Sequence, residues 1–290
     1  MSTDEVDLYQ PADGMPDGGA ARLGIGTKGA GEAGEWVWLQ RISASGPPLL
    51  GAAAAIGVWW AITVVFHIRP FFLPAPPDIV TSFRGSPSYL LRETWTTLTE
   101  TLIGFGIAMV AGLVVSIVLA ASRTIERATL PLLVALNSVP KVALAPLLVI
   151  WLGFGPHPKI VLVALICFFP VVVATMAGLA STPAELGELS RSLSASGWQT
   201  YLKIRLPWAL PQIFVGFKVA LPLAVIGAVV AENSNPAHGL GAVVALSGGS
   251  ADTPLAFAAI TLLALLSIAL FYFIVLLERL LIPWARAISG

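Results

Sequence analysis

Residues 188–207 read ELSRSLSASGWQTYLKIRLP, a strongly amphipathic and charged stretch that lies between two apolar segments. Just before it, Thr182 can act as an N-cap, Pro183 suits the first helical position, and Glu185 completes a capping box with Thr182. These signals predict a helix that begins at this point. An otherwise apolar chain must present such a segment to water, so the stretch also predicts a docking surface.

A second short helix is predicted after a break in the first. Three leucines of the first helix recur at helical spacing and form one apolar stripe: Leu186, Leu189 and Leu193. The residues SASG at 194–197 interrupt this helix, and Ser196 with Gln199 forms a second capping box. The second helix is predicted to end before Pro207, because proline disfavours a helical conformation in the residue that precedes it. The prediction is therefore helix, turn, helix.

This stretch resembles the cytoplasmic coupling loop, often called the EAA motif, of permease subunits of bacterial ATP-binding cassette (ABC) importers. The motif reads E-A-A, three residues, G, nine residues, I-x-L-P, and four residues match it: Glu188, Ile204, Leu206 and Pro207. Ser194 replaces the motif's glycine, and Leu-Ser replaces its two alanines. Because glycine permits a left-handed turn, either Ser194 adopts that turn at a cost or Gly197 has taken over the break. An interfacial amphipathic helix without a partner is the alternative.

The composition is that of a polytopic membrane protein. Hydrophobic residues make up 57% and charged residues 11% of the chain, and the mean hydropathy is +0.86, whereas soluble domains carry roughly 25% charged residues. The formal net charge of +0 argues against a nucleic-acid partner. The single cysteine, Cys167, lies in an apolar stretch, so one chain can form neither a disulfide nor a cysteine metal cluster.

Six apolar stretches approach the roughly 20 residues that a helix needs to cross a bilayer. They lie near residues 49–68, 98–121, 128–152, 160–180, 210–231 and 255–277. With the N-terminus inside, ten Lys and Arg residues fall in cytosolic segments and four in external ones. The positive-inside rule therefore favours cytosolic N- and C-termini and a cytosolic loop at 182–207. The predicted fold class is an all-α membrane protein with six transmembrane helices.

The chain divides by composition into three parts. Residues 1–46 are rich in Gly, Asp, Ser and Ala and lack a sustained apolar period, which predicts a disordered cytosolic tail. Acidic residues near the start, such as Asp4 and Glu5, occupy the place of the basic region of a signal peptide. Residues 47–97 are predicted to hold the first transmembrane helix and an external segment, and residues 98–284 the core domain with its loop at 182–207.

The resemblance to ABC permeases extends over about residues 72–284. The segments LPAPPDIVTSF (73–83), VPKVALAPLLVIWLGFG (139–155), FFP (168–170) and AEN…GLG (231–241) are similar to the branch that carries nitrate, sulfonates, taurine and pyrimidine precursors. One position departs from this branch, which commonly has an arginine where this chain has Glu100. No role is carried over to that position.

The resemblance implies a transport subunit without catalytic chemistry or a cofactor of its own. Two permease subunits, identical or homologous, would form the path, and two ATPase subunits that bind ATP and Mg²⁺ would dock beneath them in the bacterial plasma membrane. An external solute-binding protein would deliver a small solute, with heterocyclic vitamin precursors and small anions or sulfonates both open. The implied ATPase-coupling residues are Glu188, Arg191, Ser194, Gly197, Ile204, Leu206 and Pro207.

Lys141 stands out because it lies near the middle of the third predicted span. A charge at that depth is costly unless it faces water or a partner, so a path, gate or intersubunit role is predicted. Pro140 and Pro146 beside it each remove a backbone hydrogen bond and bend the helix, which suits a gate or static packing equally. The external residues Glu232 and Asn233 complete the predicted path or gate.

Other features of the spans have structural interpretations. Lys218 lies roughly two turns from the cytosolic end of its span, so its side chain is predicted to reach the interface. Pairs of small residues four apart allow close helix packing or a contribution to a subunit interface: Ala108/Gly112, Ala174/Gly178 and Gly227/Ala231.

Two other classes of function are disfavoured. An ion-coupled secondary transporter usually needs acidic groups at the bilayer midplane, yet Glu100, Glu232 and Glu278 lie near the ends of predicted spans. An intramembrane serine protease would need a histidine to activate its serine, and no histidine lies in the middle of a predicted span. A transport subunit coupled to a separate ATPase remains the prediction.

Overall fold

The computed structural model describes residues 50–120 and 122–284, and every regular element within them is helical. The chain divides into two units between residues 55 and 56, and the elements described below lie in the second. Only the helix Leu50–Val65 begins in the first unit. The predicted tail at 1–46 lies outside the described residues.

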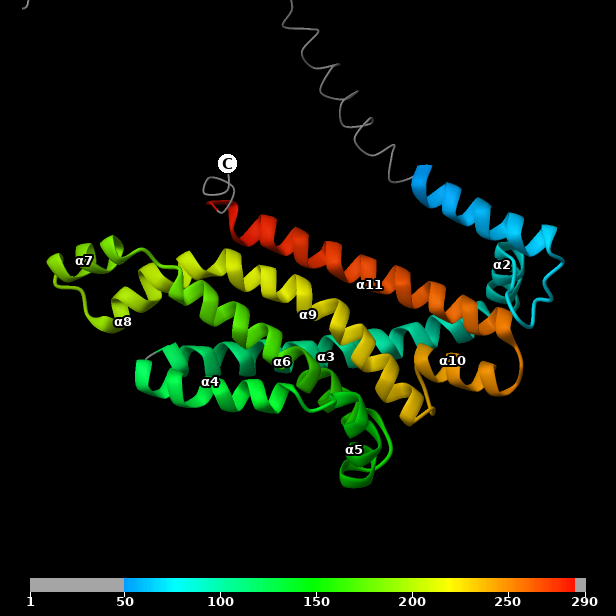
Figure 1. Cartoon of the computed structure of the whole chain (residues 1–290), viewed down its shortest axis with the longest axis horizontal. Coiled ribbons are helices and arrows are strands. Elements are labelled where there is room, and N and C mark those ends of the chain that lie inside the picture. The colour runs from blue at the N-terminus through cyan, green and yellow to red at the C-terminus, as the bar shows by residue number, and fades with distance from the viewer. Residues whose placement is uncertain (1–49, 121, 285–290) are drawn as a thin grey trace, which may run out of the picture. The chain divides into compact units, whose positions relative to one another are not determined.

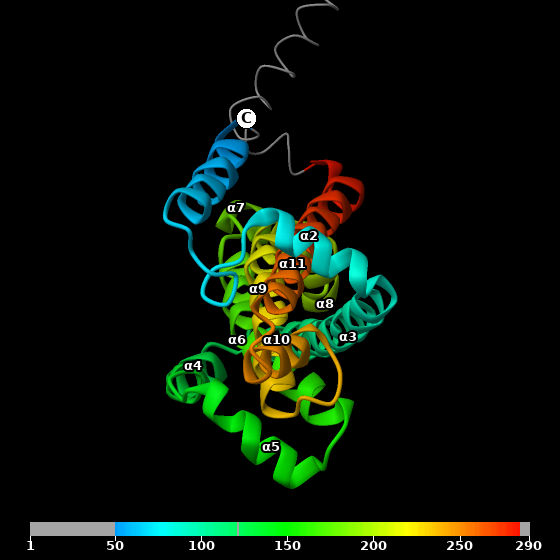
Figure 2. The ribbon, with the colours of Figure 1, turned by 90° about the vertical axis from the view of Figure 1, so that its right-hand side faces the viewer.

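Long helices make up most of the second unit (Figures 1 and 2). In chain order the elements are α2 (Pro76–Gly85), α3 (Pro87–Ala120), α4 (Arg123–Asn137), η1 (Lys141–Leu144), α5 (Ala145–Leu152), α6 (Pro156–Ala180), α7 (Ala184–Ser192), α8 (Gly197–Thr200), η2 (Tyr201–Arg205), α9 (Leu206–Ser234), α10 (Leu240–Gly249) and α11 (Thr253–Leu281). The short helices α7 and α8 lie at one end of the long helices, and α10 lies at the opposite end (Figure 1).

The core forms where α6 packs between α3 and α9, and glycines permit the close approach of these helices. A Cβ atom on Gly112 of α3 would lie 2.7 Å from the Val171 side chain of α6. A Cβ atom on Gly178 would lie 2.8 Å from the backbone carbonyl of Ala209 on α9. Such distances leave no room for a side chain, so these small residues serve helix packing within this subunit.

Four helices of the described chain are long and apolar enough to cross a membrane, namely α3, α6, the continuous helix Gly197–Ser234 and α11. A bent pair of helices raises the number to five if it counts as one span. The helix at the first predicted span, Leu50–Val65, is shorter than the length that usually crosses a bilayer. The count of six spans therefore stays a prediction.

The third predicted span, residues 128–152, is not one straight helix. It consists of two helical segments that meet at an angle of 72°. Pro140 is the N-cap of η1 and Pro146 occupies the first turn of α5, positions where the missing proline N–H costs no hydrogen bond. The break in this span therefore lies at Pro140 and Pro146, whereas Pro170 and Pro222 lie inside continuous helices.

Candidate functional site

The loop at 182–207 begins with α7, but not through the predicted capping box. The helix starts at Ala184, and Pro183 itself is the N-cap residue. The Thr182 hydroxyl donates to the Leu179 carbonyl at 3.2 Å and so satisfies the last turn of α6 instead. The Thr182 hydroxyl is thus hydrogen-bonded to the preceding helix and does not cap α7. The spacing of residues along the chain could not predict which of the two helices it would bind.

The end of α7 contains a left-handed residue, and that residue is Ser194, with φ = 54°. The Ser194 amide donates to the Arg191 carbonyl and the Ala195 amide to the Ser190 carbonyl, each at 3.0 Å. These two bonds form a Schellman motif, whose left-handed position glycine usually fills. Of the two alternatives left open by the sequence, Ser194 has kept the turn, and Gly197 instead opens α8.

Ser194→Gly is expected to stabilise the loop by roughly 0.5 to 1 kcal/mol, because glycine adopts the left-handed conformation without a steric cost. Thermal unfolding of the chain in lipid nanodiscs measures the change. Ala195→Gly is the matched control, because the φ of Ala195 is not positive, and it is expected to lose stability. A loss with Ser194→Gly equal to that of the control would contradict the prediction.

The second half of the loop leads directly into a membrane span. Ser196 and Gln199 form the predicted capping box, with the Gln199 amide donating to Ser196 Oγ at 3.2 Å. The predicted helix end before Pro207 is wrong, because the chain continues through the π-helical turn η2 into α9 as one helix, Gly197–Ser234. The ring of a proline inside a helix normally clashes with the carbonyl four residues earlier. We attribute the accommodation of Pro207 in this helix to the wider π turn just before it.

The loop presents exposed apolar side chains, and charged side chains without ion-pair partners inside the described chain. Glu188 and Arg191 are exposed and form no ion pair with another described residue. Of the predicted leucine stripe, Leu186 is half-buried, whereas Leu189 and Leu193 are 54% and 72% exposed. Exposed apolar surface of this kind, next to charges, is typical of a protein contact.

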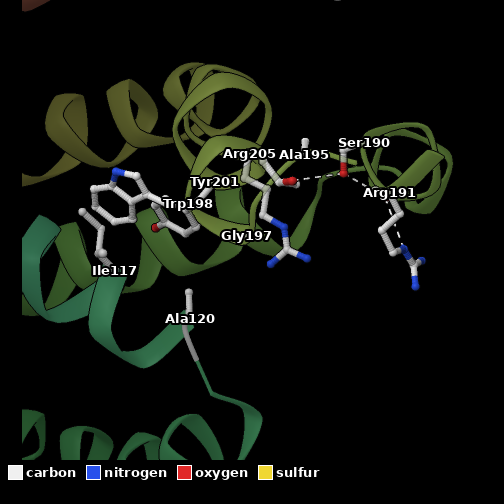
Figure 3. Close-up of a pocket in the computed structure, with 11 residues that line it drawn as sticks. Ile117, Ala120, Ser190, Arg191, Ala195, Gly197, Trp198, Tyr201 and Arg205 are labelled. Atoms are coloured by element: carbon white, nitrogen blue, oxygen red, sulfur yellow. Dashed lines mark hydrogen bonds between the residues drawn. The ribbon is translucent and has the colours of Figure 1, made fainter. Parts of the chain in front are cut away.

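Buried contacts hold the two short helices of the loop together. The buried Ser190 hydroxyl accepts a hydrogen bond from the Thr200 hydroxyl at 3.1 Å, which joins α7 to α8. Arg191 and Arg205 line a hollow of about 660 Å³ between this loop and the end of α3, and both side chains are drawn in Figure 3. The remaining predicted coupling residues Ile204, Leu206 and Pro207 are half-buried at the base of the loop.

The two predicted external residues at the end of α9 face different surroundings. Asn233 is exposed, whereas Glu232 is fully buried and accepts hydrogen bonds from the Thr97 hydroxyl at 2.7 Å and the Gly241 amide at 2.6 Å. The Leu240 amide donates to Thr97 Oγ1 at 2.8 Å. The Gly239 amide donates to the Glu93 carboxylate at 2.7 Å. Side chains of α3 and α9 therefore cap the first amides of α10.

Sequence reasoning missed the buried charges that surround Glu232. Lys159 of α6 forms an ion pair with Glu100 of α3 at 3.3 Å and donates to the His238 carbonyl at 2.7 Å. Both side chains are almost fully buried. The GLG segment at 239–241 was the signal in the sequence that could have indicated this close packing. Gly239 has φ = 107°, and a Cβ atom there would overlap the Glu232 carboxyl group.

Two further lysines have partners in the structure. Lys141 is half-buried beside a hollow of about 290 Å³, and its ammonium group donates to the Asn137 carbonyl at 3.3 Å and to the Asn137 side chain. Lys218 pairs with Glu278 of α11 at 2.7 Å, and its predicted reach to the membrane interface stays a prediction. This partner lies 60 positions away, so spacing along the chain could not identify it.

Known proteins with similar sequences are transport permeases. Residues 104–286 match the family described as binding-protein-dependent transport system inner membrane component. The formylaminopyrimidine transport permease protein of Halalkalibacterium halodurans is 36% identical over 79% of this chain and 92% of its own length. The riboflavin transport system permease protein of Chloroflexus aurantiacus is 38% identical over 78% of this chain and 86% of its own.

The fold also has a counterpart among solved structures. A chain from the MetNI methionine ABC transporter in inward-facing conformations matches with a TM-score of 0.57 and 23% identity. The match covers 67% of this chain and 95% of that one. At this identity, the comparison concerns the fold alone.

Proposed function

The chain belongs to the family of binding-protein-dependent transport system inner membrane components, and from this premise we propose that it couples to an ATPase through residues 182–207. As an ABC importer permease subunit, it contributes the membrane path for a small solute. The proposed partners are a second permease subunit, two ATPase subunits that bind ATP and Mg²⁺, and an external solute-binding protein. The chain itself carries out no catalysis in this proposal.

The continuity between the loop and a membrane span is the observation that supports this function best. The Ser190–Thr200 hydrogen bond joins α7 to α8, and α8 continues through η2 into α9 without a break. A rigid element of this kind transmits a displacement at one end to the other. An ATPase that moves the exposed face of α7 would therefore move α9.

We propose that the loop and both chain termini lie in the cytosol, where the ATPase binds. A cysteine at Ser192 of α7 should then react with an impermeant maleimide only from the cytosolic side, and one at Ser250 after α10 only from outside. Both residues are exposed, unlike the neighbouring Ser247, which is buried. Labelling of intact cells and inverted vesicles measures the difference, and the reverse pattern would exclude this docking geometry.

We propose that the hollow beside Lys141 forms part of the solute path. Its lining is apolar apart from Lys141 and Asn137, and it also contains Phe168 and Phe169 of α6. Solute sites commonly combine apolar walls with a few polar groups that orient the ligand. The Lys141 ammonium has three donors, and Asn137 takes two of them. One donor therefore remains for a solute oxygen or nitrogen, while Pro140 and Pro146 fix the break beside it.

Lys141→Met should weaken solute uptake by at least about tenfold, because a hydrogen bond from a charged group contributes roughly 1.5 to 3 kcal/mol. Uptake by proteoliposomes that contain the assembled importer measures this change, with ATPase binding unaffected. Lys141→Arg keeps the charge and serves as the matched control. Wild-type uptake by the Met variant would remove Lys141 from the path.

For the solute itself, we propose a heterocyclic vitamin precursor. Two relatives are named for formylaminopyrimidine and riboflavin, which are heterocycles, and the aromatic and apolar walls at Phe168 and Phe169 suit a flat ring. A small anion or sulfonate is the competing class, which the Lys141 charge would favour. Calorimetric titration of the cognate solute-binding protein with a pyrimidine and with an alkyl sulfonate distinguishes the two.

A further inference from the structure

The buried groups at the external end of the helices hold more negative charge than positive charge. Three carboxyl groups meet there, Glu93 and Glu100 of α3 and Glu232 of α9, and each is at most 4% exposed as a residue. Lys159 of α6 is the one buried cation among the described residues of this cluster. Buried charges without partners are strongly disfavoured, so the excess requires an explanation.

Two of the three carboxyl groups have cations as neighbours. Glu93 contacts the Arg92 guanidinium at 3.2 Å and lies 3.6 Å from His238 Nδ1, and both partners reach solvent. Glu100 contacts Lys159 at 3.3 Å. Glu232 receives only a hydroxyl and an amide hydrogen bond and forms no ion pair. It is therefore the carboxyl group that lacks a compensating charge.

The neighbour of Glu232 lacks a hydrogen-bond donor. Glu100 Oε1 forms the ion pair with Lys159, but Glu100 Oε2 is buried and has no hydrogen-bond partner among the described residues. The two carboxyl groups belong to one buried cluster. Thr97, one helical turn before Glu100 on α3, donates to Glu232, and Lys159 contacts both Glu100 and the His238 carbonyl, next to the Gly239 that touches Glu232. A buried oxygen without a donor carries a substantial cost, and a proton between the two groups would remove both the missing donor and the excess charge.

We propose that Glu100 and Glu232 form a proton-binding site in which the two carboxyl groups share one proton. The proton comes from water, and it converts two carboxylates of the same buried cluster into one carboxylic acid and one carboxylate. In this proposal the proton belongs to the pair and not to either residue alone. This proposal is independent of the role assigned to the 182–207 loop.

The shared proton would hold α10 in place at the external end. Glu232 and Thr97 cap the Gly241 and Leu240 amides at the start of α10, and Lys159 holds the His238 carbonyl just before it. Loss of the proton would leave two negative charges in one buried cluster, where like charges repel strongly. The contact between α10 and the long helices would then weaken as the pH rises.

Infrared spectroscopy of the full chain in lipid nanodiscs at neutral pH tests the proposal. The wild-type spectrum should contain the carbonyl band of a buried carboxylic acid, shifted in D₂O. The band should be lost in both Glu100→Gln and Glu232→Gln and kept in Glu93→Gln, the matched buried control. Absence of the band from the wild type would overturn the proposal, and so would its retention in either of the first two variants.

The pH dependence of unfolding provides a second test that does not depend on a spectral assignment. If the folded chain holds one proton more than the unfolded chain, its stability must fall as the pH rises through neutrality. Glu232→Gln, which is nearly isosteric and needs no proton, should lose that dependence. Identical profiles of thermal unfolding against pH for wild type and Glu232→Gln would overturn the proposal.

Discussion

Glu188→Lys is expected to release the ATPase or to uncouple ATP hydrolysis from uptake, with the spans still folded and inserted. Glu188 is exposed in the middle of α7 and lacks an ion-pair partner within the described chain. In a complex, reversal of a paired charge costs about 2 to 5 kcal/mol, which weakens binding at least about 30-fold. Copurification of the ATPase with the chain and coupled uptake in proteoliposomes measure the loss.

A purely helical role for Glu188 predicts a much smaller effect. Of the two glutamates in α7, Glu185 lies in the first turn and Glu188 does not. Even in the first turn, the interaction of a carboxylate with the helix dipole contributes only about 0.3 to 1 kcal/mol. Glu188→Gln is the matched control, because it keeps the size of the side chain and should cause an intermediate loss. Full ATPase binding and coupled uptake with Glu188→Lys would place the docking surface elsewhere in the loop.

Gly239→Ala should destabilise the folded chain by roughly 2 to 6 kcal/mol. Its φ of 107° is unfavourable for alanine, and the added Cβ atom would overlap the buried Glu232 carboxyl group. Backbone strain and overpacking each cost about 1 to 3 kcal/mol. The substitution should therefore displace the start of α10, and thermal unfolding in nanodiscs should report a large fall in stability.

Gly248→Ala provides the control on the same helix. Gly248 lies near the end of α10, where a Cβ atom would meet nothing within 4 Å. Alanine favours a helix interior over glycine by about 0.5 to 1 kcal/mol, so this variant should equal or slightly exceed the wild type in stability. Equal stability of the Gly239 and Gly248 variants would refute the close packing of α10 against Glu232.

Local signals in the sequence predicted the break in the middle of the loop, because that turn depends on neighbouring residues, but they did not predict either end of the loop correctly. The capping box of Ser196 and Gln199 and the turn at Ser194 both formed within a few positions of the residues that specify them. The capping box predicted at Thr182 did not form, because the end of α6 binds the Thr182 hydroxyl group instead. Where two helices meet, one side chain has two possible partners, and spacing does not decide between them.

Contacts between distant helices could not be predicted from spacing. Lys159 and Glu100 are 59 positions apart, and Thr97 and Glu232 are separated by 135. Only the packing of α3, α6 and α9 brings these side chains together. The break at Pro140 was also underestimated, since hydrophobicity continues through residues 128–152 although the helix does not. Apolar length predicts a span but not its straightness.

ATP hydrolysis by the reconstituted importer tests the central claim most directly. The chain is assembled with its ATPase in liposomes, and hydrolysis and uptake are measured with and without the solute-loaded binding protein. Coupling through the 182–207 loop predicts that the loaded binding protein stimulates hydrolysis and that uptake requires ATP. Uptake driven by an ion gradient in liposomes that lack the ATPase would contradict this account and identify a secondary transporter.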